Sequence, residues 1–389
     1  MSEQGSAKRI YGLDILRSIA IMSVVIGHSL WIVYGLVTPG SIIDMMFIFV
    51  ASVFGYIGVE IFFVLSGFLI GSIFIRELVK TDKSELGESV RHFWLKRWFR
   101  TLPNYYLYLL FYLFAYWFMD WKGFEDFTWR YLVFVHNFFS SGPGFFGVAW
   151  SLSVEEWFYL LLPVLFTLGY TAIRNKNTAF KLTILLLFII PFSVRIGYVL
   201  THISQSNFST TFAFSVIYRL DSIAYGVFLA WIWSIDGIKQ RLIVAKKKLF
   251  VAGISSFAVF LVYLLAFVYK NVQNPLVVLI SYPWATFSIM LCFPFMITLP
   301  MKSERWPQRM VGFISKISYS LYLAHPLFIR TFESFNDAFK PSPMIYPLYF
   351  LLVIAASFLL SYITYRYCEQ PFLALRERVL KKKPKAIVI

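Results

Sequence analysis

A chain of 389 residues could hold two or three soluble domains, but 59% of its residues are hydrophobic and only 14% are charged. That composition excludes an ordinary soluble protein and is typical of a polytopic α-helical membrane protein. The formal net charge of +16 would suit a nucleic-acid-binding protein. However, most basic residues fall on one side of the predicted spans, which explains the charge without a nucleic-acid partner.

Ten hydrophobic segments are expected to cross the membrane. The first is Leu13–Leu36, and the third is Thr101–Met119. Between them, Met45–Ile75 is too long for one perpendicular helix. We therefore place the second span at about Gly58–Ile75 and expect Met45–Tyr56 to form a half-helix or re-entrant piece. The later spans are predicted at about 152–170, 181–200, 212–233, 249–268, 276–299, 313–333 and 346–367.

The distribution of basic residues predicts the orientation of this all-α bundle. Of the 36 Lys and Arg residues, 28 lie on the side that also holds both termini. Four lie on the other side and four within spans, so the positive-inside rule places both termini in the cytoplasm. The short polar run before the first span predicts no cleaved signal peptide. Residues 1–372 are expected to form one integral-membrane domain, followed by a basic cytoplasmic tail at 373–389.

The first span carries ionisable residues on one face. Arg17 and His28 are eleven residues apart, which returns a helix to within about 20° of the same face, displaced by roughly 16 Å. Asp14 lies on the same stripe, one turn before Arg17. Because such groups are costly inside a membrane, the stripe is expected to face the bundle interior or a wet cavity.

The second span also has a polar face. Glu60 shares it with Gly67 and Gly71, so this face is expected to pack closely against another helix. In span six, Arg219 and Asp221 do not share a helix face, and we expect each to pair with a different helix.

Adjacent carboxylates open the fourth span. In WSLSVEEWFY, Ser153 and Glu156 have the spacing of a capping box, so Glu156 is explained by a helix start. The capping box does not explain Glu155, for which a functional or site-shaping role is about as well supported as a structural one.

The remaining candidate residues are histidines and their neighbours. Ser318, Tyr322 and His325 fall near one face of span nine, where His325 is either a second reactive group or, somewhat better supported, a packing residue. His136 and Asn137 lie in a predicted outer loop, within reach of an extracytoplasmic substrate. No metal-ligand cluster and no phosphate-binding loop of the P-loop type is present in the sequence.

Seven segments together resemble a known family. They occur in order over Tyr11 to about Phe372: LDILRSIAIMSVVIGHS, GVEIFFVLSGFLIG, KRWFRTLPNYYL, WSLSVEEWFYLLLP, RLDSIAYG, SYSLYLAHP and YRYCEQPF. Each segment alone is weakly specific, but seven in register are specific. The chain thus resembles the family-3 membrane acyltransferases, which O-acylate bacterial surface glycans and some secondary metabolites.

The resemblance implies a bundle of about ten transmembrane helices in the bacterial inner (cytoplasmic) membrane. The donor would be cytoplasmic acyl-CoA, most often acetyl-CoA, with no bound cofactor or metal. The acceptor would be a hydroxyl of a surface or lipid-linked glycan. Arg17 with His28 matches the family's arginine–histidine motif, and Arg97 with Arg100 matches its R-x-x-R motif. The Glu155–Glu156 pair matches its S-L-S-V-E-E segment, with Trp157 where glutamine is frequent.

These motifs suggest that the two ends of the first span have different roles. Arg17, Arg97 and Arg100 are candidates to hold the phosphates of CoA, since guanidinium groups make bidentate phosphate contacts. His28 would be the general base for the acceptor hydroxyl, with a transient acyl-histidine as the alternative. Glu60 or Glu155 could orient its imidazole, while Glu156, His136, Asn137 and His325 are candidates to bind the acceptor.

Two other classes of protein would also use a polytopic fold. A transporter or flippase for a lipid-linked saccharide would place charged residues on bundle faces, but it commonly shows inverted repeats, and none is visible by eye. A structural membrane subunit would leave the Arg17–His28 stripe unexplained. Acceptor-dependent consumption of a thioester would favour the enzyme over both.

Overall fold

The computed structural model describes residues 10–79, 86–119, 121, 126–138, 144–201, 208–269, 275–300 and 305–381. Within these ranges the chain is almost entirely helical and contains no strand. The α-helices run in chain order as α1 (Tyr11–Leu30), α2 (Ile42–Phe74), α3 (Leu86–Phe118), α4 (Ala149–Ile173), α5 (Lys176–Thr201), α6 (Phe208–Phe214), α7 (Leu220–Trp233), α8 (Asp236–Tyr269), α9 (Pro275–Ile297), α10 (Trp306–Phe339), α11 (Tyr346–Thr364) and α12 (Gln370–Lys381).

Shorter 3-10 and π segments join or extend these helices. They are η1 (Trp31–Leu36), η2 (Ile75–Val79), η5 (Trp129–Val133), η6 (Val216–Tyr218), η7 (Pro343–Ile345) and η8 (Tyr365–Glu369). Nine of the ten expected spans each fall on one described helix or on a helix with its short extension, but the expected span at 212–233 is divided among α6, η6 and α7. In the described part of the chain, seven helices are long and apolar enough to cross a membrane: α1 with η1, α2, α4, α5, α8, α9, and α11 with its extension.

The fold is therefore that of a multi-pass, all-helical membrane protein, as the composition predicts. The helices α3 and α10 are long but less apolar, and α7 has only 14 residues. The count of ten spans and the cytoplasmic placement of both termini stay predictions. Residues 373–381 of the expected tail form most of α12, which packs along α3.

Two local expectations are wrong. Met45–Tyr56 is not a separate half-helix, because α2 is continuous over 33 residues. Such a helix is about 50 Å long and extends beyond a 30 Å hydrocarbon core. Ser153 does not cap a helix either, since α4 already begins at Ala149. The Ser153 hydroxyl donates instead to the Ala149 carbonyl (3.1 Å).

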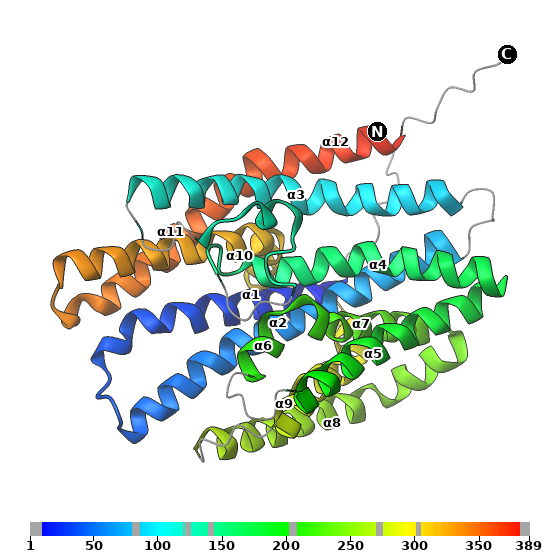
Figure 1. Ribbon diagram of the computed structural model, residues 1–389, viewed down its shortest axis with the longest axis horizontal. Coiled ribbons are helices and arrows are strands. Elements are labelled where there is room, and N and C mark those ends of the chain that lie inside the picture. Colours follow the sequence, from blue (N-terminus) through cyan, green and yellow to red (C-terminus); the bar gives the residue numbers. More distant parts are fainter. Residues whose placement is uncertain are drawn as a thin grey trace.

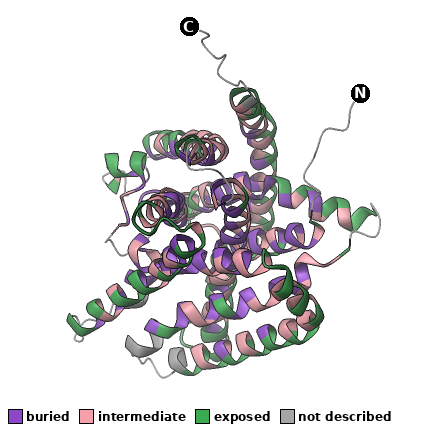
Figure 2. Ribbon diagram, turned by 90° about the vertical axis from the view of Figure 1, so that its right-hand side faces the viewer, coloured by how far each residue is buried: buried purple, intermediate pink, exposed green. Residues whose placement is uncertain are grey.

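The helices pack roughly side by side, with α1, α2 and α10 near the centre and α8 and α11 at the edge (Figure 1). We call the end formed by the first turns of α1, α3 and α10 and the last turn of α2 the basic end; it faces right in Figure 1. Viewed onto that end, buried segments gather in the middle of the bundle (Figure 2). The outer helices expose large apolar side chains such as Val262 and Leu351, as expected for surfaces that contact lipid.

Close packing of α2 against α7 uses the glycine face predicted in the second span. A methyl group added to Gly67 would collide with the Ile223 carbonyl, and one on Gly226 with the Val64 carbonyl. Small residues at such contacts let helix backbones approach closely in a membrane. The contact brings Arg219, just before α7, against Glu60 of α2.

Arg219 and Asp221 pair with different helices, as expected. Arg219 donates to Glu60, and Thr286 of α9 donates to the other carboxylate oxygen (2.7 Å). Arg195 of α5 forms a two-pronged pair with Asp221 (3.1 and 2.5 Å). These ion pairs tie α2, α5, α7 and α9 together.

Candidate active site

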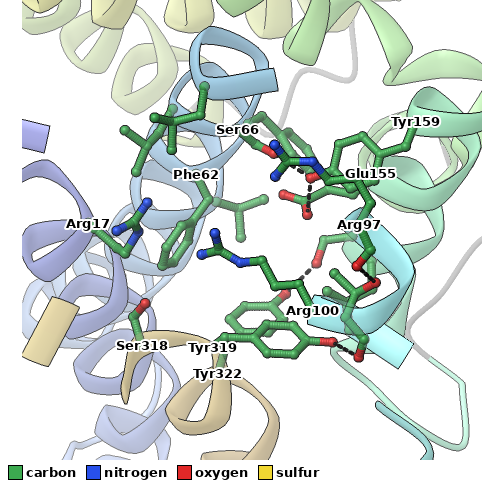
Figure 3. A pocket seen from close by; sticks show the side chains of 17 residues that line it. Arg17, Phe62, Ser66, Arg97, Arg100, Glu155, Tyr159, Ser318, Tyr319 and Tyr322 are labelled. Carbon is green, nitrogen blue, oxygen red and sulfur yellow. Dashed lines mark hydrogen bonds between the residues drawn. The ribbon is translucent and has the colours of Figure 1, made fainter. Parts of the chain in front are cut away.

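A cavity lies between α1, α2, α3, α4 and α10 and holds three of the predicted basic residues. The guanidinium groups of Arg17, Arg97 and Arg100 point into it (Figure 3). It measures about 810 Å³, counting the part that opens to solvent. Three cations and a single lining carboxylate, Glu155, give it a positive balance. The arginines expected to act together thus meet, although α1 and α3 are far apart in the sequence.

Each arginine is held differently. Arg17 donates to the Ser315 hydroxyl (3.2 Å), which in turn donates to Asp14 (2.7 Å), so the first-span stripe is anchored on α10. Arg97 is buried and lies over the Tyr159 ring, 5.9 Å from its centroid. Among the described residues, Arg100 makes no hydrogen bond or ion pair, which leaves its five donors available to an anion.

Glu155 belongs to a hydrogen-bonded chain on the wall beside Arg97 (Figure 3). Tyr159, one turn later on α4, donates its hydroxyl hydrogen to Glu155 (2.8 Å). Its oxygen lies 2.5 Å from the Ser66 hydroxyl of α2. Because Tyr159 has used its one hydrogen, Ser66 is the donor in that second bond. Glu155 is thereby tied to α2 as well as to its own helix.

His28 lies at the far end of the same face of α1 from Arg17. Its Nδ1 is 2.9 Å from Nε2 of His325 on α10, and the two rings lie nearly end to end, with centroids 5.2 Å apart and planes 23° apart. His325 is fully buried, and its Nδ1 lies 3.0 Å from the Leu321 carbonyl oxygen. The two helices are therefore bridged twice, by Arg17 with Ser315 and by His28 with His325.

Polar residues of α10 follow the stripe of α1 from one bridge to the other. Ser315, Ser318, Tyr322 and His325 recur every three or four residues, and Ser318 and Tyr322 line the cavity. The Tyr322 ring lies 5.9 Å from that of His325, and its hydroxyl is 2.6 Å from Ser151. Tyr322 therefore stands between the arginines and the histidine pair. The shared face expected for Ser318, Tyr322 and His325 is confirmed.

Other predicted site residues lie elsewhere. Glu60 is occupied by Arg219 and Thr286. The contact to the His28 imidazole, for which Glu60 and Glu155 were the two candidates, comes from His325. Glu156 is buried on α4 but does not belong to the described lining of the cavity.

Of the two residues predicted to lie in an outer loop, His136 and Asn137, the second holds the loop against neighbouring helices. Asn137 donates to the carbonyl oxygens of Trp150 (3.0 Å) and Phe214 (2.6 Å), which ties the loop to α4 and α6. The His136 ring stacks on Tyr131 with centroids 4.0 Å apart. Neither of its nitrogens has a hydrogen-bond partner within the described part of the chain. Burial lowers the pKa of His136 to about 4, so this loop side chain is neutral near pH 7.

Three residues around the site were missed by reasoning from sequence. Ser66 directly precedes Gly67 in the second span, and nothing in the sequence links it to Glu155. Tyr159 could have been found, because it follows Glu155 by four residues and therefore shares its helix face. Gly55 carries no such signal. A Cβ atom added there would lie 3.3 Å from His28 Nε2, so this glycine leaves room beside the imidazole.

Comparison with known proteins identifies the family. Residues 10–366 match the family model described as an acyltransferase domain. The chain belongs to this acyltransferase family. The prediction from the seven motifs is thus confirmed, and the chain is a multi-pass membrane protein of that family.

Its curated relatives are longer proteins. O-acetyltransferase OatA of Staphylococcus aureus (strain NCTC 8325 / PS 47) is 27% identical over 94% of this chain and 57% of its own length. Putative O-acetyltransferase SACOL0978 of Staphylococcus aureus (strain COL) is 24% identical over 97% of this chain and 59% of its own length. The chain therefore spans less than two thirds of these relatives. No solved structure matches it significantly.

Proposed function

We propose that this protein transfers an acyl group, acetyl in the first instance, from acyl-CoA to a hydroxyl of a surface or lipid-linked glycan. The observation that carries the proposal is the paired stripe of α1 and α10. It has an arginine cavity suited to an anion at one end and, at the other, a histidine whose Nε2 has no hydrogen-bond partner among the described residues. The names of the O-acetyltransferase relatives support acetyl as the transferred group.

The arginine cavity is the donor site in this proposal. CoA carries several phosphates, and guanidinium groups bind phosphate oxygens in bidentate, charge-assisted pairs. Arg100 is the best placed to do so, since it makes no hydrogen bond or ion pair among the described residues. The excess of basic residues on the side that holds the basic end supports a cytoplasmic mouth, from which cytosolic acyl-CoA would enter.

The distance along α1 matches the reach of the donor. Arg17 and His28 are separated by roughly 16 Å along the helix axis, similar to an extended pantetheine arm. Phosphates held at the arginines would therefore place the thioester carbonyl near His28. The apolar lining residues between the two ends, such as Val59 and Leu152, suit the arm and a short acyl chain.

His28 then acts as the general base. A sugar hydroxyl attacks the thioester carbonyl while His28 Nε2 removes its proton, which forms the new C–O bond. Collapse of the tetrahedral intermediate breaks the C–S bond, and the same proton passes from His28 to the departing sulfur. The products are an O-acyl glycan and CoA with a free thiol. A two-step route through an acyl-histidine would use the same nitrogen of His28 as nucleophile.

The carboxylates have supporting roles. Glu155 balances the charge of the arginine cavity and holds Tyr159 and Ser66 in the wall beside Arg97. Glu60 is assigned to the α2–α7 contact rather than to the imidazole, because both of its oxygens are already bonded. Glu156, His136 and Asn137 receive no part in the transfer, because none of them lies on the paired faces of α1 and α10, and Asn137 already donates to two carbonyl oxygens.

The experiment uses the full chain reconstituted in nanodiscs with acetyl-CoA and glycan extracted from the host envelope. Thiol release measures donor consumption, and mass spectrometry measures the acetylated glycan. The wild-type protein is expected to release thiol only when acceptor is present, and His28→Ala to lose both signals. A His28→Ala variant that is folded and fully active would overturn the proposal, as would glycan movement without thiol release.

A further inference from the structure

The hydrogen bonds of His28 and His325 determine which of their ring nitrogens carry a hydrogen. The Leu321 carbonyl oxygen can only accept a hydrogen bond, so the His325 Nδ1 that lies 3.0 Å from it must carry a hydrogen. A neutral imidazole has a single N–H, and His325 Nε2 is therefore an acceptor. The backbone of α10 thus sets the tautomer of His325.

The same reasoning extends to His28. Its Nδ1 lies 2.9 Å from the acceptor nitrogen of His325, so His28 Nδ1 is the donor in that bond. In the neutral ring, Nε2 of His28 is then left with a free lone pair. This is the opposite of the tautomer that a neutral histidine prefers in water, where Nε2 carries the hydrogen.

We propose that His325 is a positioning residue that holds His28 in the Nδ1–H tautomer and makes Nε2 its reactive nitrogen. The inference rests on the proposed function for the role of His28 in acyl transfer. The arrangement itself, one carbonyl fixing two successive rings, follows from the hydrogen bonds alone.

The surroundings of Nε2 fit this assignment. No hydrogen bond reaches that nitrogen from any described residue, and it faces the backbone of α2 at Gly55. Since glycine has no side chain, the backbone of α2 can approach Nε2 without a Cβ atom pressing on it, and His28 stays partly exposed. Gly27 allows α1 and α2 to approach closely at this level, where its own Cβ would lie 2.7 Å from the Gly55 nitrogen.

A neutral partner also suits the depth of the pair in the bundle. In many hydrolytic sites a carboxylate orients the base, but a buried carboxylate costs several kcal/mol unless another charge or several donors compensate it. An imidazole acceptor fixes the tautomer without adding charge. The hydrogen bond between the two rings also limits the rotation of His28 about its side-chain bonds.

The test is nitrogen-15 solid-state NMR of the full chain labelled at histidine in lipid. The chain has only five histidines, and a His28→Ala spectrum assigns the His28 signals by difference. The wild-type protein is expected to show His28 with a protonated Nδ1 and an unprotonated Nε2. In His325→Leu, which removes the acceptor, the His28 proton should move to Nε2.

Kinetics provide the second readout. We expect His325→Leu to lower kcat for acetyl transfer by about 10²-fold, the lower range for loss of acid–base catalysis, with the KM for acetyl-CoA unchanged. His325→Gln offers an amide oxygen as acceptor and should recover part of kcat and the wild-type tautomer. His92→Gln, at a partly exposed histidine of α3, is the matched control and should change neither quantity.

Two results would overturn the inference: a wild-type His28 with hydrogen on Nε2, or a His325→Leu variant that keeps the Nδ1–H tautomer. Failure of the proposed function looks different. In that case His28→Ala would remain active while the tautomer of His28 still depended on residue 325.

Discussion

Removal of Arg219 should destabilise the bundle far more than removal of both Arg219 and its partner. The Arg219 guanidinium is 1% exposed and pairs with Glu60, whose side chain is fully buried. In Arg219→Met, Glu60 keeps only the neutral donor Thr286. In the double variant Glu60→Gln with Arg219→Met, neither charge of this pair remains.

The magnitude follows from the burial of the pair. Taking one partner from a buried ion pair typically costs about 3–5 kcal/mol, because the remaining charge stays desolvated and unpaired. One hydrogen bond to a charged group returns about 1.5–3 kcal/mol at most, and Thr286 already makes it in the wild type. We therefore expect Arg219→Met to cost about 3–5 kcal/mol, and the double variant about 1–2 kcal/mol from lost hydrogen bonds and packing.

The assay is an SDS titration of each purified variant in mixed micelles, monitored by circular dichroism. The single variant should unfold at a clearly lower SDS fraction than the double variant. Acetyl transfer per folded molecule should stay within a few-fold of wild type in the double variant, because Glu60 is structural in this account. Equal stability of the single and double variants would refute the reasoning, and loss of transfer in a stable double variant would restore a catalytic role to Glu60.

Three further predictions concern the site and its loop. Gly55→Ala places a methyl group 3.3 Å from His28 Nε2 and should lower kcat about tenfold, whereas Gly197→Ala, which meets open space on α5, should leave kcat unchanged. Arg97→Ala should raise the KM for acetyl-CoA about tenfold, equivalent to about 1.4 kcal/mol, with a smaller change for acetyl phosphopantetheine, which lacks the nucleotide. Between pH 6.5 and about 4 the unfolded chain protonates His136 but the folded loop does not, so stability should fall as the pH falls through this window and should fall less in His136→Phe.

Each of these predictions has a contradicting result. Equal rates for the Gly55 and Gly197 variants would show that the space beside Nε2 is not used. An unchanged KM in the Arg97 variant would remove that residue from the donor site. Identical profiles of stability against pH for wild type and the His136 variant would show that the pKa of His136 does not differ between the folded and the unfolded chain.

Features set by local periodicity could be predicted from the sequence. The 3.6-residue repeat placed Arg17 and His28 on one face and Ser318, Tyr322 and His325 on another, and both faces look inward in the structure. The glycine spacing around Gly67 likewise predicted a close helix contact, although not its partner.

Features set by tertiary contact could not be predicted. His28 and His325 are 297 residues apart, and no local pattern shows that their rings meet. The assignment of Glu60 also depended on a distant residue, Arg219, which reaches it only because α2 and α7 pack together. The capping-box interpretation of Ser153 failed for a related reason, since the apolar stretch before it packs in the core and extends α4 by one turn.

The most direct test of the central claim is acetyl transfer by the reconstituted protein with and without the His28 imidazole. Wild type and His28→Ala are each mixed with radiolabelled acetyl-CoA and acceptor glycan, and donor binding is measured on the same samples. We predict that His28→Ala binds acetyl-CoA as tightly as wild type and transfers acetyl at least about 10²-fold more slowly. Transfer at the wild-type rate by the His28→Ala protein would contradict the account.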